Sequence, residues 1–570
     1  MNSEAKWFKY YGNIPKTLDY PDVSMYKMLK KTAEKHGEKI AYVFMGKSVT
    51  YSAFMEEIEI CAKALLQQGV KKGETVTVCM PNVPQALVMF YAINRIGAIA
   101  SMVHPLSAEN EIMFYLNEAD SRIAITLSSF YPKFKAISGK TKLNKLIIAK
   151  IGEALPPVKK CLYKFVGHEA KVPDDASVIS WKSFMESGKK STSIISHSGK
   201  GSDSAVILFS GGTTGTSKGI LLTNLNFNAL GLQTVAASGC FEPGDTMLSV
   251  MPIFHGFGLG VGIHTMLSCG GKCVLVPRLN VKEFPGLFKK YKPNYMAGVP
   301  TLFEAIMRNP DMQKADLSAM KGMFSGGDTL SVELKKKIDA FIKERGATIQ
   351  VREGYGTTEC VTASCLTPPE YYREGSIGIP FPDTYYKIVT PDTLDEAPAG
   401  EMGEICIAGP TLMKEYINHP EETATTLKKH ADGRTYLHTG DLGYMDEDGF
   451  VYFVQRLKRM IVTSGYNVYP SQVENVIDSH EAVMFSCVIG VKDSLKIQKV
   501  KAFVVLKPGF VPSEEIRNSI KEHCAKSIAK YAMPKEFEFR DDLPKTLVGK
   551  IAYRELEKEE NERYKEECVK

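Results

Sequence analysis

Residues Glu74–Pro105, ETVTVCMPNVPQALVMFYAINRIGAIASMVHP, contain the pattern that decides the fold of this chain. A valine-rich apolar run is followed by an amphipathic stretch with helical spacing, and then by a second apolar run. This order is typical of a β-strand, a crossover helix and a parallel β-strand. The alternation continues through SRIAITLSS and KLIIAK and resumes at AVILFSGG, DTMLSVMP, GKCVLVP, YMAGVP and GMFSGG. The sequence therefore predicts an α/β fold with stacked, mainly parallel sheets within residues 1 to about 380.

The pattern changes twice in the rest of the chain. From Gly378 to Gly409, short strands and turns predict a β-rich subdomain. After FVYFVQRLKRMIV, the segments PSQVENVIDSH, FSCVIGV, KAFVVL and SEEIRNSIKEHCAKSIAKY predict a compact α+β unit. The apolar stripe of its last helix consists of Ile516, Ile520, Cys524 and Ile528.

These changes divide the chain into two predicted domains. We expect a large N-terminal domain over residues 1–455, a hinge at 456–458 and a small, mobile α+β domain over 459–570. The length of 570 residues agrees with at least two domains, because a single core stops growing well below this size. The tail from Glu555 is highly charged, which is typical of a solvated helix or a disordered end.

Composition excludes several classes of protein. The chain is 44% hydrophobic and 24% charged, as in ordinary soluble proteins, and its net charge of +6 gives no reason to expect nucleic acid as a partner. Twelve cysteines are scattered, many of them inside apolar runs, which favours free thiols in a reducing compartment. The pair Cys269 and Cys273 has no second pair at zinc-finger spacing, so we interpret it as structural.

One uncharged segment, Thr246–Gly271, is long enough to cross a membrane. It contains Pro252, two histidines and six glycines, so we expect a buried strand, loop and helix instead. The N-terminal sequence MNSEAKWFKYYGNIPK lacks the apolar core of a signal peptide. We therefore expect a cytoplasmic protein. Peripheral contact with the inner face of the membrane, and a monomeric or homodimeric state, are left open.

A run of glycines, hydroxyl residues and one lysine follows a predicted strand in Ile207–Asn224, ILFSGGTTGTSKGILLTN. Exposed backbone N–H groups beside a lysine suit a polyanion such as a triphosphate. The loop is not of the Walker A type, because Ser217 stands where that motif requires glycine. An ordinary solvated turn between a strand and a helix is the alternative interpretation.

Five further polar stretches lie between the predicted strands. They are SGGDTL (325–330), EGYGTTEC (353–360), LHTGDLGY (437–444), RLKRMIVTSGYNVYPSQVE (456–474) and DLPKTLVGKI (542–551). Together with the glycine-rich loop and in this order, they resemble the motifs of the adenylate-forming, AMP-binding family. Within that family the chain is most similar to bacterial long-chain fatty acid CoA ligases. The resemblance extends over essentially the whole chain.

The resemblance implies a two-step reaction and its co-substrates. ATP activates a medium- to long-chain fatty acid to an acyl-adenylate with release of pyrophosphate, and the acyl group is then transferred to CoA; Mg²⁺ is the implied metal. The implied phosphate-binding residues are Ser210, Gly211, Gly212, Thr213, Thr214, Gly215, Thr216 and Lys218. Thr214 and Glu359 are the implied metal ligands, and carboxylate and hydroxyl oxygens suit Mg²⁺. Without its motif, Glu359 would be a helix-capping or surface carboxylate.

The resemblance also assigns the nucleoside site and the lysine. The implied nucleoside-binding residues are Gly327, Asp328, Gly354, Tyr355, Gly356, Thr357, Thr358, Asp441 and Arg456. Tyr355 suits stacking on adenine, and Asp441 suits the ribose hydroxyls. The alternatives are a core tyrosine, a turn aspartate and a rim salt bridge. Lys550 is the implied catalytic charge on the α-phosphate and the acyl carboxylate, whereas a lone lysine near a C-terminus is normally solvated.

Two further regions are assigned by resemblance. Lys458 is the implied pivot of the hinge, and Ser464, Gly465 and Tyr466 are the implied lining of the CoA path. His255 is the implied catalytic-site histidine at the mouth of the acyl pocket, with a buried structural histidine as the alternative. The glycines 258, 260 and 262 would leave a long space open, which favours a chain over a compact ring.

The sequence leaves other interpretations open. The same adenylation chemistry could act on an aromatic acid such as 4-coumarate, or pass the acyl group to a carrier-protein pantetheine. No carrier domain follows Lys570, which favours free CoA. An oxidative luciferase and a non-catalytic binding relative are less favoured, since Lys550, Glu359 and Asp441 are all present. Ala532 stands where the family commonly has lysine, which puts a CoA-phosphate contact there in doubt.

Overall fold

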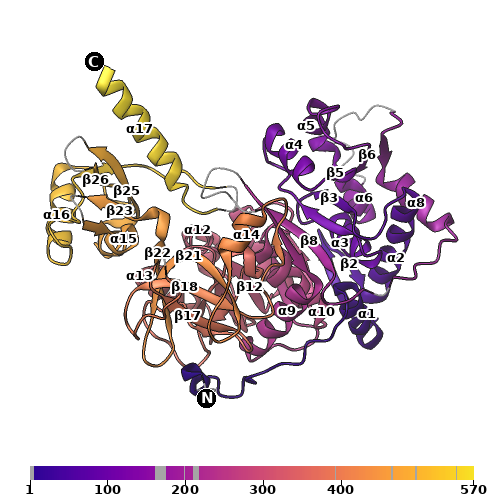
Figure 1. Cartoon of the computed structure of the whole chain (residues 1–570), viewed down its shortest axis with the longest axis horizontal. Helices are drawn as coiled ribbons and strands as arrows, with labels where there is room; N and C mark the ends of the chain where they lie inside the picture. Colours follow the sequence, from indigo (N-terminus) through magenta and orange to yellow (C-terminus); the bar gives the residue numbers. More distant parts are fainter. Residues whose placement is uncertain are drawn as a thin grey trace.

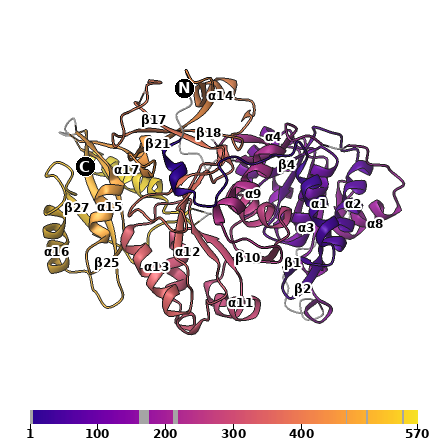
Figure 2. The same ribbon diagram turned by 90° about the horizontal axis from the view of Figure 1, so that it is seen from below.

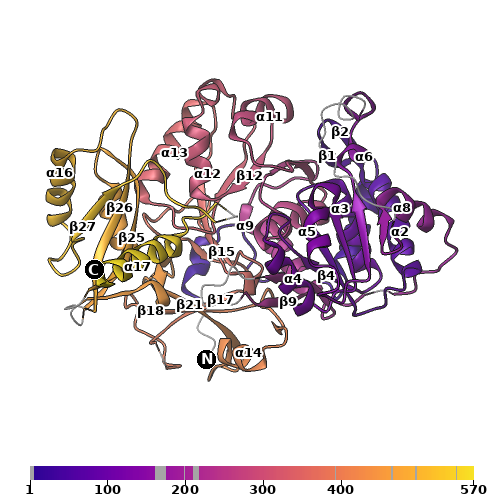
Figure 3. The same cartoon turned by 90° about the horizontal axis from the view of Figure 1, so that it is seen from above.

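The computed structural model of the protein describes residues 5–160, 175–197, 199–209, 217–391, 393–463, 466–493, 497–546 and 549–569. Three views agree on the order of its parts (Figure 1, Figure 2 and Figure 3). Helices α2 (Tyr51–Gln67) and α8 (Trp181–Lys190) lie at one end, and the C-terminal unit with α16 (Glu514–Ala525) lies at the other. The polar motifs fall on the elements between these two ends.

An eight-stranded sheet organises the first part of the chain. In spatial order its strands are β19 (Glu415–Tyr416), β9 (Gly219–Thr223), β8 (Ser204–Phe209), β4 (Ile99–Met102), β3 (Thr75–Cys79), β5 (Ile123–Leu127), β6 (Lys145–Ala149) and β7 (Val178–Ser180). The strands from β8 to β7 are parallel, and β9 and β19 add an antiparallel edge. All five residues of β5 are buried, as expected for a parallel strand covered on both faces.

A nine-stranded sheet follows the same rule. In spatial order its strands are β16 (Ile379–Pro380), β15 (Cys365–Leu366), β14 (Val351–Tyr355), β13 (Gly322–Ser325), β12 (Tyr295–Gly298), β10 (Thr246–Ser249), β11 (Lys272–Leu275), β1 (Ile40–Phe44) and β2 (Lys47–Thr50). The strands from β14 to β1 are parallel, and antiparallel strands close both edges. The prediction of stacked, mainly parallel sheets is confirmed.

Helix α3 (Pro84–Arg95) and the π-helix η3 (Phe257–Thr265) connect the two sheets through one core. Every residue of α3 from Pro84 to Asn94 is buried, and proline at its first position suits a helix start. The hydroxyl of Tyr91 on α3 lies 3.0 Å from Nδ1 of His264 on η3. The uncharged segment 246–271 is therefore a strand followed by a π-helix inside the protein. Among the described residues, the helices are all too short or too polar to cross a bilayer.

The remaining helices of the large domain pack around these sheets. They are α1 (Met25–His36), α4 (Glu109–Glu118), α5 (Tyr131–Ala136), α6 (Ile151–Ala154), α9 (Asn224–Ser238), α10 (Met266–Ser268), α11 (Phe284–Tyr291), α12 (Pro300–Arg308) and α13 (Val332–Glu344). The short 3₁₀ helices here are η1 (Lys6–Tyr10), η2 (Ser128–Phe130), η4 (Val281–Glu283), η5 (Pro310–Lys314) and η6 (Thr358–Cys360).

The β-rich subdomain is an antiparallel sheet. Its strands are β17 (Tyr385–Val389), β18 (Gly403–Ala408), β21 (Thr435–Met445), β20 (Leu427–Lys429) and β22 (Val451–Arg456), and helix α14 (Pro420–Thr426) precedes β20. The sheet therefore extends to Arg456, well beyond the predicted range that ended at Gly409. The N-terminal segment docks between this sheet and the nine-stranded one. Trp7 and Tyr11 share a core cluster with Phe450, and the hydroxyl of Tyr11 donates to the carbonyl of Pro380 on β16 at 2.8 Å.

The C-terminal unit has its own sheet and core. After the 3₁₀ helix η7 (Leu457–Arg459) come β23 (Ile461–Thr463), β24 (Tyr466–Val468), α15 (Pro470–Asp478), β25 (Val483–Asp493), β26 (Ile497–Leu506), α16, β27 (Glu536–Phe539) and α17 (Tyr553–Val569). The predicted apolar stripe faces this core, although α16 ends at Ala525, before Ile528. Ala532 packs against the same core.

Helix α17 corrects the expectation of a solvated or disordered tail. Figure 1 shows it projecting from the C-terminal unit. Its first turns are nevertheless packed, because Leu556 is fully buried and Glu560 forms an ion pair of 2.8 Å with the buried Lys501. The charged composition of the tail concealed these two inward positions. The cysteines that the structure describes are free thiols, and most of them are buried.

Candidate active site

The polar motifs converge at one edge of the nine-stranded sheet. Strands β12, β13 and β14 are parallel neighbours, so their carboxyl ends meet at the same edge. Ser325 ends β13 and is followed by Gly326, Gly327 and Asp328, while Tyr355 ends β14. Gly327 has φ +80°, which favours glycine. Gly354, Gly356, Thr357 and Thr358 continue the second loop, whose residues lie against the β-rich subdomain.

Asp441, which is buried, forms a cluster at this edge with the half-buried Tyr355 and Arg456. The hydroxyl of Tyr355 donates to Asp441 Oδ2 at 2.5 Å, and Arg456 Nε lies 3.0 Å from Oδ1. Asp441 and Arg456 face each other across β21 and β22 in register. Oδ1 of Asp441 is buried and forms the ion pair with Arg456, but within the part of the chain that the structure describes it accepts no well-aligned hydrogen bond. A carboxylate oxygen in this state can still accept from a polar ligand, because its hydrogen-bonding capacity is not filled.

Burial controls the protonation of this cluster. Burial raises the pKa of Asp441 above its ordinary value, although the Arg456 guanidinium opposes the shift. Burial likewise raises the pKa of Tyr355 well above its ordinary value, so its hydroxyl stays protonated and can donate. The Asp441 carboxylate raises the pKa of Arg456, which remains a cation.

A bulge in the sheet sets the position of Asp441. The pairing of β18 with β21 shifts register between Glu404 and Cys406. Glu404 fills the bulge, where its carboxylate accepts from Gly440 N at 2.8 Å and pairs with His438 Nδ1 at 2.7 Å. Burial alone would raise the pKa of Glu404, but these two bonds outweigh burial and lower it. Glu404 therefore holds the backbone immediately before Asp441.

The residues around Glu404 also contain a group with metal-ligand chemistry. Ligand atoms of Glu404, Cys406 and His438 lie within 4.8 Å of one another. The His438 ring is already engaged on both sides, since Nδ1 contacts Glu404 and Nε2 lies 3.0 Å from Nε2 of His430. The contacts of this group support the β18–β21 bulge, and we interpret it as structural.

Glu359 lies in a second polar group. Its carboxylate accepts from the Tyr416 hydroxyl at 2.8 Å, and its backbone carbonyl accepts from Met413 N at 2.7 Å. Lys218 lies over the Tyr416 ring at 5.2 Å and 3.6 Å from Glu422. The structure thus brings together Lys218 and Glu359, two of the predicted residues, through a tyrosine that sequence reasoning missed.

Lys550 reaches this edge from the C-terminal unit. A Cβ built on Gly327 would lie 3.5 Å from Cε and 3.9 Å from Nζ of Lys550. Burial lowers the pKa of Lys550, with the Asp328 carboxylate opposing the shift. The alternative of a solvated lysine near a C-terminus therefore does not apply, because Lys550 is half-buried at this edge. The hydroxyl of Thr301, at the start of α12, donates to the carbonyl of the preceding residue, Gly549, at 2.7 Å.

His255 is a half-buried, neutral residue close to Lys550. Burial lowers its pKa to about 3, and the Lys550 charge adds to the shift. Its Nδ1 accepts from Phe257 N at 3.2 Å. The structure therefore brings His255 to the predicted site, where its environment excludes the charged form.

The expectation that three glycines of η3 leave a long space open is wrong for two of them. A Cβ on Gly258 would lie 2.1 Å from the Pro252 carbonyl oxygen, and a Cβ on Gly260 would lie 2.6 Å from Leu230. These glycines permit close packing of the π-helix. Gly262 alone of the three has room, since its nearest neighbour is the Phe257 carbonyl at 3.8 Å.

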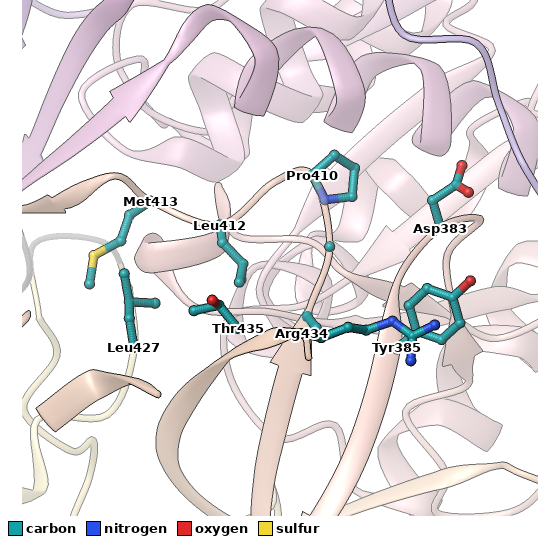
Figure 4. A pocket seen from close by; sticks show the side chains of 10 residues that line it. Asp383, Tyr385, Pro410, Leu412, Met413, Leu427, Arg434 and Thr435 are labelled. Carbon is teal, nitrogen blue, oxygen red and sulfur yellow. The ribbon is translucent and has the colours of Figure 1, made fainter. Parts of the chain in front are cut away.

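A separate pocket of about 480 Å³ lies in the β-rich subdomain (Figure 4). Its lining includes Leu412, Met413 and Leu427 on the apolar side and Arg434 and Asp383 on the polar side. Asp383 already accepts from Leu18 N and from the Tyr20 hydroxyl at 2.8 Å each. Met413 connects this pocket to the polar group around Glu359, because its backbone N–H donates to the carbonyl of Glu359.

Several predicted residues fall outside the described part of the chain. They are Ser210, Gly211, Gly212, Thr213, Thr214, Gly215, Thr216, Ser464 and Gly465, and the side chains of Lys458 and Tyr466 are also not described. Sequence reasoning missed Thr301, Glu404 and Tyr416. The segment GEIC preceding the TGD motif was a signal for Glu404, whereas the contacts of Thr301 and Tyr416 depend on distant segments.

Comparisons of sequence and fold with known proteins identify the family of this chain. The family models AMP-binding enzyme and AMP-binding enzyme C-terminal domain match residues 29–417 and 472–550. The long-chain-fatty-acid–CoA ligase of Bacillus subtilis (strain 168) is 35% identical over 576 residues, covering 99% of this chain and 100% of the relative. The ATP-bound crystal structure of MatB from Rhodopseudomonas palustris has a TM-score of 0.81 at 25% identity and covers 94% of this chain and 98% of its own. The apo structure of MatB, with the same identity and coverage, has a TM-score of 0.72.

Proposed function

The chain belongs to the AMP-binding enzyme family, and from this premise we propose that it is a fatty acid–CoA ligase that forms acyl-AMP and then acyl-CoA. The similarity to a long-chain-fatty-acid–CoA ligase over the full length of both chains supports this choice of reaction. The observation that carries the proposal is the position of Lys550, which lies beside Gly327 and within electrostatic reach of Asp328, Asp441 and Arg456.

The cluster of Asp441, Tyr355 and Arg456 is the proposed nucleoside site. Asp441 accepts the ribose hydroxyls through Oδ1, which is paired with Arg456 but accepts no well-aligned hydrogen bond among the described residues, while Tyr355 holds Oδ2. Arg456 keeps Asp441 charged and offers further donors to the sugar. The loops at Gly327 and Gly354 let the backbone approach the base closely. The assignments of Asp328, Gly356, Thr357 and Thr358 to this site are part of the same proposal.

The first half-reaction needs positive charge at the α-phosphate. The fatty acid carboxylate attacks the α-phosphorus, the bond to the bridging oxygen breaks, and pyrophosphate leaves with its electron pair. Two anions approach each other, so positioning and charge supply most of the catalysis. Lys550 is the cation in position for this role. Neutral His255, on the acyl side, adds no competing charge.

The phosphate side of the site fits a divalent cation. The carboxylate of Glu359 is held by the Tyr416 hydroxyl and retains further lone pairs. Hard oxygen ligands of this type suit Mg²⁺, which would neutralise phosphate charge when bound. We propose Glu359 and Thr214 as its protein ligands, and residues 210–216 with Lys218 as the phosphate-binding loop.

The second half-reaction is assigned to a rearranged small domain. The thiol of CoA attacks the acyl carbonyl, and AMP leaves. We propose domain limits of 1–455 and 459–570, with residues 456–458 as the hinge and Lys458 as its pivot. Ser464, Gly465 and Tyr466 line the path of CoA in this proposal. The separate core of the C-terminal unit supports its movement as one body.

Chain length gives a direct test of the substrate. Each buried CH₂ contributes about 0.8 kcal/mol, so two more carbons should raise kcat/KM on the order of tenfold until the pocket ends. We expect a maximum within the C8–C18 straight-chain acids. The measurement is thioester formation with ATP, Mg²⁺ and CoA across straight-chain, branched and aromatic acids. A maximum at acetate, or at 4-coumarate above all C8–C18 acids, would contradict the proposed substrate class.

Glu404 should affect ATP binding without touching ATP. Glu404→Ala removes the acceptor of Gly440 N and loosens the turn before Asp441, so the KM for ATP should rise about tenfold with little change in kcat. Glu404→Gln keeps one acceptor oxygen, so its KM for ATP should lie between those of Glu404→Ala and the wild type. The KM for CoA should not change.

The neighbouring Glu401 provides the control for this variant. It is exposed and lies three residues earlier in the same segment, so Glu401→Ala should leave the KM for ATP unchanged. Equal effects of the two substitutions would show that Glu404 has no special part in positioning Asp441.

A further inference from the structure

We propose that Thr301 is a positioning residue for the first half-reaction, which holds Lys550 in the pose that faces the α-phosphate. The proposal rests on the proposed function, because it assigns Thr301 a part in adenylation and none in thioester formation. Thr301 belongs to the large domain and Lys550 to the small one, so their contact depends on the relative position of the two domains.

The contact itself is short and direct. The hydroxyl of Thr301, the second residue of α12, donates to the Gly549 carbonyl at 2.7 Å across a sequence separation of 248. The backbone of Gly549 lies close to the large domain, since a Cβ at this position would be 3.5 Å from Cγ2 of Val299. Gly549 has φ +85°, a conformation that glycine adopts without strain.

The position of the carbonyl determines the position of the lysine. The Gly549 carbonyl and the Lys550 N–H belong to one planar peptide unit. Thr301 fixes one end of this unit, and the Thr546 hydroxyl accepts from Lys550 N at 3.1 Å at the other end. Thr546 N also donates to the Lys550 carbonyl at 2.7 Å. The backbone on both sides of the Lys550 side chain is therefore held.

The charges around the contact agree with this role. Lys550 is half-buried beside Gly327, and the carboxylates of Asp328 and Asp441 and the Arg456 cation all act on its charge. These three charges alone do not fix the position of the Lys550 ammonium group, because each charge acts over several ångströms. A hydrogen bond is directional, and the bond from Thr301 supplies that constraint.

Helix α12 touches the C-terminal unit at its other end as well. Arg308, in its last turn, contacts the sulfur of Met484 and pairs with Glu304 at 2.7 Å. Thr301 and Arg308 thus place the same helix against two parts of the small domain. Once the small domain moves away for thioester formation, the bond from Thr301 to Gly549 is no longer made, and the loss of the hydroxyl should have no effect.

The test uses Thr301→Val, which removes the hydroxyl and keeps the branched shape. In the full chain, pyrophosphate release with fatty acid, ATP and Mg²⁺ should fall about 2- to 10-fold through kcat, with the KM for ATP unchanged. Thioester formation from preformed acyl-AMP and CoA should stay at the wild-type rate. Thr301→Ser, which restores the donor, should recover most of the first activity.

Thr32→Val is the matched control. Thr32 also donates its hydroxyl to a backbone carbonyl, that of Ser268 at 2.5 Å, but both residues lie within the large domain. This variant should leave the ratio of the two half-reactions unchanged. A wild-type rate of pyrophosphate release for Thr301→Val, or an equal loss in both half-reactions, would overturn the proposal.

Hydrogen exchange separates this inference from the proposed function. In the ligand-free protein, the peptide containing Lys550 should exchange faster in Thr301→Val than in the wild type and in Thr32→Val. This measurement needs no turnover. Unchanged exchange would overturn the role of Thr301 even if the enzyme makes acyl-CoA. A wild-type protein that activates no fatty acid would instead overturn the proposed function, whatever the exchange result.

Discussion

Lys550→Ala will remove most of the first half-reaction and leave the second intact. The substitution deletes a half-buried cation that we propose acts on the charge that develops on the α-phosphate, a loss on the order of 3 to 4 kcal/mol, or at least a few hundredfold in rate. Pyrophosphate release with fatty acid and ATP measures the first step. The variant supplied with preformed acyl-AMP and CoA should make thioester at the wild-type rate, since we assign Lys550 no part in that step.

Lys545 is the matched control, because it lies in the same turn but pairs with Asp542 at 2.6 Å near the surface. Lys545→Ala should leave both half-reactions unchanged. The reciprocal variant Gly465→Leu, which would fill the proposed CoA path, should release pyrophosphate and accumulate acyl-AMP. Loss of both half-reactions in a folded Lys550→Ala protein would contradict the assignment of each half-reaction to a different position of the small domain.

The pH dependence of the first half-reaction should also report on Lys550. Burial lowers its pKa below the ordinary lysine value of 10.5, so the catalytic cation is present at low pH and is lost as pH rises through the lowered value. The rate of pyrophosphate release should therefore decline earlier on the alkaline side than an exposed lysine would allow. This decline should be absent from the residual activity of Lys550→Ala.

Asp441→Ala is expected to raise the KM for ATP strongly. A hydrogen bond to a charged group contributes roughly 1.5 to 3 kcal/mol, so even one lost ribose bond corresponds to a tenfold to hundredfold weaker interaction. The KM for CoA should change little. Initial rates at varied ATP and varied CoA give both values.

The variant also leaves Arg456 and the Tyr355 hydroxyl without their common partner, so thermal unfolding must accompany the kinetics. Asp448→Ala is the control, because Asp448 lies between the same two strands and pairs with Lys9 and Arg373 at the surface. An unchanged KM for ATP in a stable Asp441→Ala protein would show that Asp441 is a turn residue with no part in binding ATP.

The architecture of the sheets followed from the sequence because a parallel strand must be apolar on both faces. The runs at β3, β4, β5 and β6 could therefore be read directly, and the amphipathic segments between them identified crossover helices. The limits of the β-rich subdomain were wrong because β21 alternates less regularly. Its polar TGD motif interrupts the strand pattern at the bulge opposite Glu404.

The packing of α17 and the surroundings of the η3 glycines were predicted less well from the sequence. The charged composition of α17 predicted a solvated tail, but a single fully buried leucine and the Glu560–Lys501 pair hold its first turns. For η3, glycine could mean either an open space or a close approach, and sequence cannot separate the two. The Pro252 carbonyl, only 2.1 Å from the position of a Cβ at Gly258, decides for close packing.

The sequence by itself determined the α/β fold class, the family and the order of the polar motifs, because periodicity and motif spacing are local properties of the chain. The tertiary structure decided which of these groups meet. Lys550 lies at Gly327 because the small domain is docked on α12, and the partner of Thr301 is 248 residues away in the sequence. Likewise, Asp441 meets Tyr355 through one carboxylate oxygen and Arg456 through the other, beside a bulge held by Glu404. Such contacts arise from packing between distant segments, and packing energies have no local pattern in the sequence.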